Sequence, residues 1–159
     1  MKGKYDDLDF AILREIRKNA KLPIRALAAI LGSHPNTIMQ RIKRLEKDKI
    51  IKKYVAQIDY TALGYNISNL IEIQLSEKGR KDWTILKELK RYPEVTHIYA
   101  VTGIYDIMMI AKTKYIVDLN NLLKRINKLP YIVRTETSLI LEEIKKGYDY
   151  NPFENYNKR

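Results

Sequence analysis

The sequence predicts an α+β protein in which an N-terminal winged helix-turn-helix is followed by a ferredoxin-like βαββαβ domain. Three observations lead to this prediction. Apolar residues recur with a helical period on both sides of a short break that holds Gly32 and Pro35. Basic side chains gather beside that break, since seven of the residues 41–53 are Lys or Arg. The second half of the chain then alternates strand-like and helix-like stretches in the order βαββαβ.

The first two helices follow from apolar spacing and from the residues at their starts. Leu8, Ile12 and Ile16 recur every four residues, so a helix is predicted over 7–18. Acidic residues near its start favour a helix N-terminus there. The second helix is expected to begin at Pro23, because the N–H group that proline lacks is unpaired in the first turn of any helix.

A third helix is predicted to begin at Pro35 for the same reason, with Ser33 or His34 as its N-cap. The break before it is about four residues long, which leaves room only for a tight corner. Residues 50–58 are rich in β-branched and basic side chains, so they predict a strand that acts as the wing. The helices, the tight turn and the wing together predict a DNA-binding module.

The outward face of the third helix is polar and basic, which suits a polyanionic partner. Asn and Gln side chains can pair with base edges, and Lys and Arg can hold phosphates. The residues predicted to contact double-stranded DNA are Ser33, His34, Asn36, Thr37, Gln40, Arg41, Lys43, Arg44, Lys52 and Lys53. The alternative interpretation of this stretch is an ordinary pair of helices with a solvated basic face.

The second half of the chain predicts a four-stranded antiparallel sheet with two helices on one face. The predicted strands are 69–75, 96–102, 107–112 and 132–141, and the predicted helices are 81–91 and 115–129. Trp83 and Tyr115 are expected to be core residues of those helices. The other face of the sheet would stay open, and its side chains are not very polar, so we predict self-association through it.

The predicted organisation places the winged helix-turn-helix at residues 1–58 and a linker at 59–67. The ferredoxin-like domain, residues 68–147, is expected to make the oligomer and to hold any effector. A polar tail, residues 148–159, is expected to follow it.

Composition narrows the class of protein. The chain has 159 residues, a net charge of +11 and no cysteine, so neither disulfides nor thiolate sites are available to it. No apolar run reaches the roughly 18–20 residues of a membrane span, and the charged start lacks a signal-peptide core. We therefore expect a cytoplasmic, nucleoid-associated protein with no membrane partner.

An enzyme is not expected. The two histidines, His34 and His97, lie in different predicted domains, and no spacing of His, Asp and Glu suggests a metal site. The sequence holds no glycine-rich phosphate loop and no nucleophile-elbow serine. No catalytic residue, metal or cofactor is therefore predicted.

A series of short motifs runs in order along nearly the whole chain. The motifs are Asp6-x-x-Asp9-x-x-Ile12-Leu13, Leu27-Ala28 before Gly32, Arg41-Ile42-Lys43-Arg44-Leu45-Glu46 before Ile50-Ile51, Leu63-Gly64, Pro93-x-Val95, Val101-Thr102-Gly103-x-Tyr105-Asp106 and Thr135-x-Thr137. This series resembles the Lrp/AsnC (feast/famine) family of bacterial and archaeal transcription regulators. The resemblance implies a sequence-specific DNA-binding transcriptional regulator of archaeal type that acts as a homodimer, tetramer or octamer. One departure is visible, because His34 stands where the family usually has Ser.

The resemblance also implies that a small amino acid binds as an effector. Gly103 can adopt a positive φ and let a ligand approach the backbone closely, and Asp106 offers a carboxylate to an ammonium group. The residues implied for this site are Thr102, Gly103, Tyr105, Asp106, Thr135 and Thr137. The alternative interpretation of the loop is a plain hairpin in which Asp106 bonds its own backbone.

Two other classes of protein are alternatives to a sequence-specific transcription regulator. An RRM-like RNA-binding protein shares the βαββαβ order but needs aromatic residues on its third strand, and residues 107–112 contain none. An architectural chromatin protein would bind DNA with little difference between a promoter and a random duplex.

Overall fold

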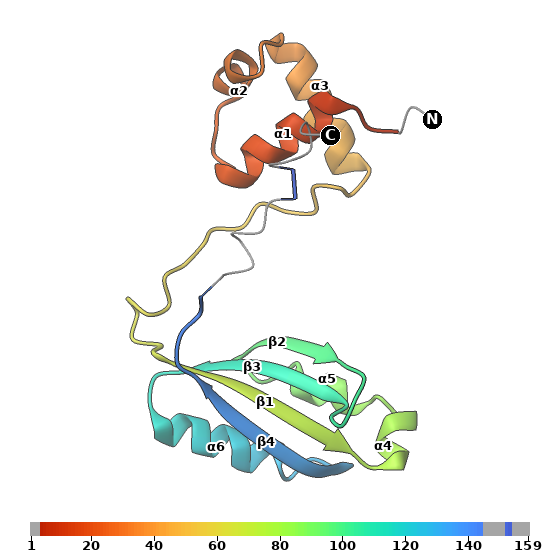
Figure 1. Ribbon diagram of the computed structural model, residues 1–159, viewed down its shortest axis with the longest axis vertical. Coiled ribbons are helices and arrows are strands. Elements are labelled where there is room, and N and C mark those ends of the chain that lie inside the picture. The colour runs from red at the N-terminus through yellow and green to blue at the C-terminus, as the bar shows by residue number, and fades with distance from the viewer. Residues whose placement is uncertain (1–3, 145–151, 154–159) are drawn as a thin grey trace. The chain divides into compact units, whose positions relative to one another are not determined.

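The computed structural model describes residues 4–144 and 152–153, which form two compact units. The first unit holds residues 4–57 together with 152–153, and the second holds residues 58–144 (Figure 1). Among the residues so described, no helix is long and apolar enough to cross a bilayer. Most of the predicted tail, 148–159, lies outside the described residues. Of its two described residues, Phe153 places its ring 5.9 Å from that of Phe10.

The first unit is a bundle of three helices, as predicted from the apolar spacing. The helices are α1 (Asp7–Lys18), α2 (Ile24–Ile30) and α3 (Pro35–Lys47). The side chains that meet in their shared core are Ile12, Leu27, Ala28, Ile38, Ile42 and Leu45. A capping box begins α1, because the Asp6 carboxylate accepts from the Asp9 N–H and the Asp9 carboxylate accepts from the Asp6 N–H.

The corner between α2 and α3 is closed by backbone hydrogen bonds around a left-handed glycine. Gly32 has a φ of +60°, a conformation that L side chains rarely adopt. The Ser33 N–H donates to the Ala28 carbonyl at 3.0 Å, and the Gly32 N–H donates to the Ala29 carbonyl at 3.3 Å. This is the Schellman pattern, which ends α2 and turns the chain into α3 within a few residues.

The predicted wing strand over 50–58 is wrong for this structure. A β-strand needs a neighbour to accept and donate its backbone hydrogen bonds, and no described segment of the first unit pairs with these residues. The segment runs instead as exposed, irregular chain. It is anchored where Ile51 packs against the helical core and where the Tyr54 hydroxyl donates to Glu46 at 2.8 Å.

The second unit has the predicted ferredoxin-like βαββαβ fold. Its strands are β1 (Ile67–Leu75), β2 (Val95–Ala100), β3 (Ile107–Thr113) and β4 (Ile132–Ile140), and its helices are α4 (Glu77–Lys81), α5 (Ile85–Leu89) and α6 (Ile116–Ile126). The strands lie in the order β2-β3-β1-β4, and every neighbouring pair is antiparallel (Figure 1). Buried residues of α5 and α6 join one core with β1 and β3, so these helices cover the same face of the sheet.

The helix predicted over 81–91 is shorter in the structure: it is α5, residues 85–89, and a separate short helix, α4, ends at Lys81 before it. The chain breaks at Asp82, the C-cap of α4, whose carboxylate accepts from the Thr84 N–H at 3.2 Å. Because Asp and Thr form such local bonds readily, they compete with a continuous helix.

Two side chains predicted to lie in the core are on the surface. Trp83 is 39% exposed and Tyr115 is 66% exposed. Trp83 falls in the break between the two helices, and the core positions of α5 are filled by Ile85 and Leu89, which lie four residues apart. Tyr115 is the N-cap residue of α6 and therefore precedes its apolar stripe.

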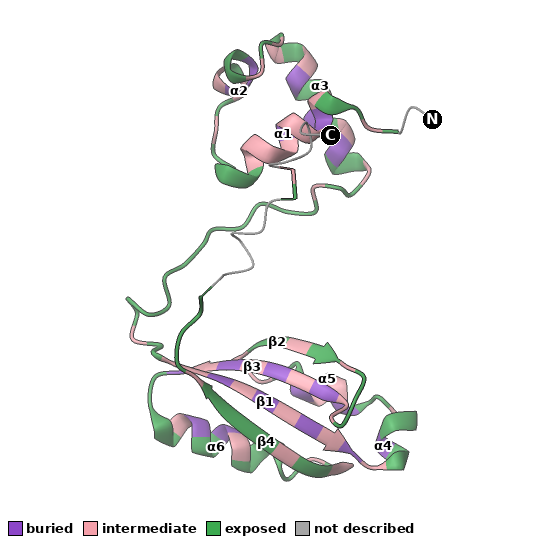
Figure 2. Ribbon diagram, viewed as in Figure 1, coloured by how far each residue is buried: buried purple, intermediate pink, exposed green. Residues whose placement is uncertain are grey.

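The two faces of the sheet differ in burial, as Figure 2 shows by the alternation of colour along β1 and β3. On the helix-covered face, the residues of β1 and β3 are buried. The open face carries Leu70 directly opposite Ile110, with Glu72 opposite Met108 on the same side, and these four side chains are only half-buried. A single copy of the unit therefore leaves an apolar strip along the middle of its open face.

Candidate functional site

The exposed face of α3 carries amide and lysine side chains. Its buried residues, Ile38, Ile42 and Leu45, follow the helical period and set the opposite face outward. On this outward face, three residues predicted to contact DNA are exposed, namely Asn36, Gln40 and Lys43, and Thr37 beside them is half-buried. Amide side chains can both donate to and accept from base edges, and a lysine can donate to phosphates.

The N-cap of α3 is His34 rather than Ser33. The imidazole Nδ1 of His34 accepts a hydrogen bond from the Asn36 N–H at 3.2 Å. An accepting Nδ1 carries no hydrogen, so the neutral ring bears its hydrogen on Nε2. His34 is exposed, and its Nε2–H therefore remains as a donor at the start of the helix. Ser33 contributes its backbone N–H to the preceding turn.

The two arginines predicted to contact DNA are held by carboxylates of α1. Arg41 Nη1 lies 2.6 Å from Asp6 Oδ2 and 3.1 Å from Asp9 Oδ2. Arg44 Nη2 also donates to Asp9 Oδ2, and the Asp9 side chain is fully buried. The hydrogen bond from Arg41 holds the pKa of Asp6 below its ordinary value, and the same pair raises the pKa of Arg41. We call these four side chains the α1–α3 clamp.

An aromatic side chain completes the surroundings of the clamp. The Arg44 guanidinium lies 5.7 Å from the centre of the Tyr5 ring, in cation–π range. The Tyr5 hydroxyl donates to Asp48 Oδ2 at 3.1 Å, and Lys4 pairs with the same oxygen at 3.0 Å. Together with the clamp, these contacts link the start of α1 and the residues before it to the middle and the C-terminal end of α3. The four residues of the clamp belong to two of the short sequence motifs, but the sequence did not reveal that they bind one another.

Five lysines beside α3 are exposed and form no ion pair with any described residue. They are Lys43, Lys47, Lys49, Lys52 and Lys53. The carboxylate of nearby Glu46 accepts a hydrogen bond from the Tyr54 hydroxyl. Burial and this hydrogen bond raise the pKa of Tyr54 to about 12. The positive surface available to a polyanion is therefore supplied by lysine. Lys52 and Lys53, both predicted contacts, belong to it.

The loop predicted as an effector site lies between β2 and β3. Gly103 has a φ of +122°, and a Cβ built on it would meet no described atom within 4 Å. Thr102 is exposed. The Tyr105 hydroxyl donates to Glu136 on β4, which raises the pKa of Tyr105. Glu136 was not predicted as part of this site, because nothing in its local sequence distinguishes it from an ordinary strand residue.

Asp106 is engaged with the backbone of β1. Its Oδ2 accepts from the Leu75 N–H at 2.7 Å, and its own N–H donates to the Ile73 carbonyl at 2.9 Å. The strand pairing of β1 with β4 shifts register between Gln74 and Leu75, so this carboxylate satisfies an N–H at the irregular point. Arg80 approaches the other carboxylate oxygen at 3.8 Å. Asp106 therefore binds the backbone of a neighbouring strand, whereas the alternative interpretation expected it to bind the backbone of its own turn.

The two threonines predicted for this site lie on the other face of the sheet from Tyr105 and Glu136. Thr135 and Thr137 pair with Ile73 and Ile71, whose side chains are buried beneath the helices. The Thr135 hydroxyl donates to Asn127 at 2.9 Å, at the end of α6. One chain by itself therefore does not gather the six predicted residues around a single cavity. Within the described residues, no cluster of His, Asp and Glu could hold a metal ion.

Comparison with known proteins covers both units. Residues 5–52 match the family described as Winged helix-turn-helix DNA-binding, and residues 69–150 match the Lrp/AsnC ligand binding domain. The HTH-type transcriptional regulator FL11 of Pyrococcus furiosus is 36% identical to this chain over 146 residues, covering 92% of the chain and 95% of the relative.

Solved structures show the same architecture. AsnC of E. coli is 30% identical, has a TM-score of 0.82, and aligns over 89% of this chain and 95% of its own. A transcriptional regulator from Neisseria meningitidis, solved in complex with L-Met, has a TM-score of 0.83 at 22% identity, covering 90% and 94% of the two chains. At that identity the second likeness concerns the fold alone.

Proposed function

The chain belongs to the Lrp/AsnC family of DNA-binding transcriptional regulators, and we propose that it reads a specific operator as a dimer or a larger oligomer. The observation that carries this proposal is a division of roles on α3. Its two arginines are bound to α1, whereas its amide and lysine side chains face solvent. Such a face can enter a major groove while the clamp keeps the helix in place.

Base reading is assigned to the first two turns of α3. Asn36 and Gln40 are both exposed and lie four residues apart, so they stand on one face of the helix with Thr37 beside them. Amide side chains can pair with adenine through two hydrogen bonds, which discriminate against other bases by about 1–3 kcal/mol. His34, at the start of the helix, would donate its Nε2–H to the DNA backbone.

Phosphate binding is assigned to the free lysines, in particular Lys43, Lys52 and Lys53. Two of these lie on the irregular segment after α3, which takes the place that a wing strand would have. Arg41 and Arg44 are half-buried and neutralised by carboxylates, so they would add less to DNA affinity than their charge suggests. The protein would thus act on the nucleoid, in the cytoplasm.

Self-association is assigned to the open face of the sheet in the proposed oligomerisation domain, residues 68–147. The half-buried strip formed by Leu70, Ile110 and Met108 would be covered by the same strip of a second copy, related by a two-fold axis. A homodimer of this kind presents two recognition helices to a pseudo-palindromic site. Tetramers or octamers would add further contacts between dimers.

An amino-acid effector is assigned to the loop formed by residues 102–106, completed by residues of a neighbouring subunit. Tyr105 and Glu136 stand on one sheet face and the Thr135 hydroxyl on the other, so a partner must supply part of the predicted set. The L-Met complex of a protein with the same fold supports a ligand of this class. Binding between subunits would couple the effector to assembly and then to DNA.

The salt dependence of binding, measured on a selected operator and on a random duplex, tests the proposal. A dimer that neutralises roughly 6 phosphates should show a log–log slope near −5, hence about a thousand-fold loss of affinity between 50 and 200 mM salt. The operator should bind at least about a thousand-fold more tightly than the random duplex. Equal affinities would indicate the architectural chromatin protein, and a flat salt response would contradict the assignment of phosphate binding to the lysines.

A further inference from the structure

Asp6 is the exposed carboxylate of the α1–α3 clamp. Its side chain is 55% exposed, whereas the side chain of Asp9 is fully buried. The two oxygens of Asp6 have different partners. Oδ1 accepts from the Asp9 N–H at 3.2 Å and caps α1, while Oδ2 accepts from Arg41 Nη1 at 2.6 Å. The contact with Arg41 can therefore be lost while the cap is kept.

Arg41 lies at the border between the clamp and the exposed face of α3. Thr37, a predicted DNA contact, stands one helical turn before it, so the two side chains are neighbours on the helix surface. The Arg41 side chain keeps 26% of its surface exposed. Asp6 and Asp9 both bind it through Nη1. If Asp6 let go, Asp9 would still hold this nitrogen and keep the guanidinium at the edge of the exposed face.

The pair formed by Asp6 and Arg41 is of a kind that a phosphate can replace. A carboxylate and a phosphate both offer anionic oxygens to a guanidinium. An ion pair that is open to water contributes little net stability, because the solvent screens it. Duplex DNA supplies phosphates at high local density, with one charge for about each 1.7 Å of its length. An exposed carboxylate beside a DNA-binding face therefore competes with the DNA backbone for the same arginine.

We propose that Asp6 competes with DNA phosphate for Arg41 and thereby lowers the affinity of the protein for every DNA sequence. This inference rests on the proposed function, because it requires α3 to dock on DNA. Arg41 is then a phosphate contact additional to the lysines, and it becomes available when the charge of Asp6 is removed. Phosphate contacts carry no sequence information, so the ratio of operator affinity to random-duplex affinity does not depend on Asp6.

The variant Asp6→Asn tests the inference, because it separates the cap from the charge. Asn is as good an N-cap as Asp, and its carbonyl oxygen can accept from the Asp9 N–H. Its amide group has no anionic oxygen to hold Arg41. We expect the affinity of the full chain for both the selected operator and a random duplex to rise tenfold or more at low salt. The log–log salt slope should become steeper by about 2, since each subunit of a dimer neutralises one further phosphate.

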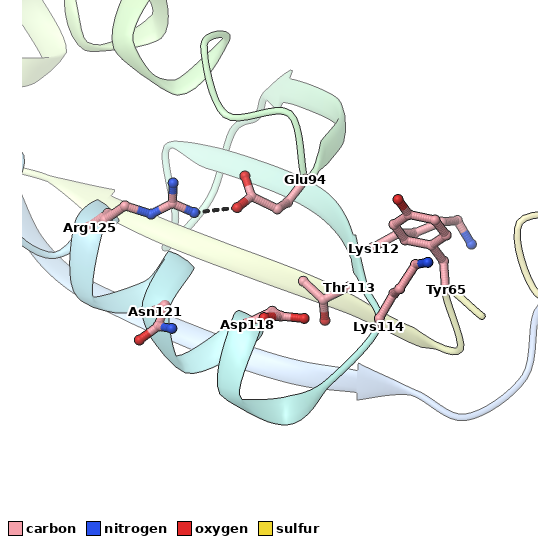
Figure 3. A pocket seen from close by; sticks show the side chains of 8 residues that line it. All are labelled: Tyr65, Glu94, Lys112, Thr113, Lys114, Asp118, Asn121 and Arg125. Atoms are coloured by element: carbon pink, nitrogen blue, oxygen red, sulfur yellow. Dashed lines mark hydrogen bonds and ion pairs between the residues drawn. The ribbon is translucent and has the colours of Figure 1, made fainter. Parts of the chain in front are cut away.

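Two control variants distinguish the release of Arg41 from the loss of one negative charge. Asp7→Asn removes the neighbouring carboxylate, which is exposed and forms no ion pair with any described residue. Glu94→Gln releases a different arginine, because Arg125 of the second unit pairs with Glu94 beside a cavity of about 390 Å³ (Figure 3). We expect each control to change DNA affinity by less than about threefold and the salt slope by less than about 0.5.

A variant of the arginine shows whether the gain in affinity depends on Arg41. Arg41→Gln keeps a hydrogen-bond donor without the charge, so adding Asp6→Asn to it should raise DNA affinity by less than about threefold. Thermal unfolding checks that every variant is folded at the temperature of the binding measurement.

Three results would overturn the inference. Asp6→Asn could raise affinity no more than Asp7→Asn does, the gain could persist in the Arg41→Gln protein, or it could be confined to the operator. A wild-type chain that binds neither duplex would contradict the proposed function itself, and the inference with it.

Discussion

Arg41 of α3 donates to the buried Asp9 of α1 across 3.1 Å, so the helix proposed to read DNA is fastened to its neighbour by a charged hydrogen bond. Arg44 donates to the same oxygen of Asp9, and the same Arg41 nitrogen, Nη1, also donates to Asp6. A buried carboxylate shared in this way is costly to break, because whichever group remains is left poorly solvated. The clamp therefore fixes the orientation of α3 while leaving its polar face free.

A variant of the clamp should lower the stability of the protein, whereas a variant of the exposed face of α3 should leave stability unchanged. We expect Asp9→Ala to lower the free energy of unfolding by about 3 kcal/mol, because two guanidinium groups lose their shared partner and the capping box is broken. Lys43→Ala, the matched control on the exposed face, should change it by less than about 0.5 kcal/mol. Urea denaturation measures both. A similar, small loss in the two variants would mean that the clamp contributes little.

The histidine N-cap gives a second prediction. His34→Ala should destabilise the protein by about 1 kcal/mol, since the Asn36 N–H loses its acceptor, whereas His34→Ser should restore a good cap. Thermal unfolding at neutral pH measures the difference. If the alanine and serine variants unfold at the same temperature, the ring nitrogen is not serving as the cap.

The pH dependence of stability follows from Asp6. Its hydrogen bond to Arg41 lowers the pKa of the folded state below the ordinary value of 3.8. The resulting stabilisation is complete above that ordinary value and is lost as pH falls through the lower, folded-state pKa. Asp6→Asn keeps an N-cap side chain but removes the charge, so it should cost about 1 kcal/mol or less at neutral pH, given its exposure. In strong acid the two proteins should become equally stable, and a constant difference at every pH would contradict this.

The sequence predicted the fold well because its dominant signals are local. Helical periods in 7–18 and around Ile38 and Ile42 specify amphipathic helices, and the alternation in 69–75 specifies a half-buried strand. The failures have local causes too. Residues 50–58 have strand-forming side chains but no described strand to pair with, and the bonds that Asp82 makes interrupt a predicted helix.

The candidate sites were less predictable, because they depend on contacts between distant segments. Asp9 and Arg41 lie 32 positions apart, and the motif that contains each gave no sign of the bond between them. Glu94 and Arg125 also pair across separate parts of the second unit, and no spacing rule links them. The Tyr105–Glu136 contact spans 31 positions in the same way. Pairings of this kind become visible only when the sheet is formed.

The most direct test of sequence-specific operator reading is selection of bound DNA from a random pool, done with the wild-type chain and with Gln40→Ala. We predict that the wild type selects a pseudo-palindrome whose half-sites lie about one helical turn apart, or a multiple of it, roughly 10–10.5 bp per turn. Gln40→Ala should keep the spacing but lose preference at one or two positions in each half-site. A pool that yields no consensus with the wild-type chain would contradict the account.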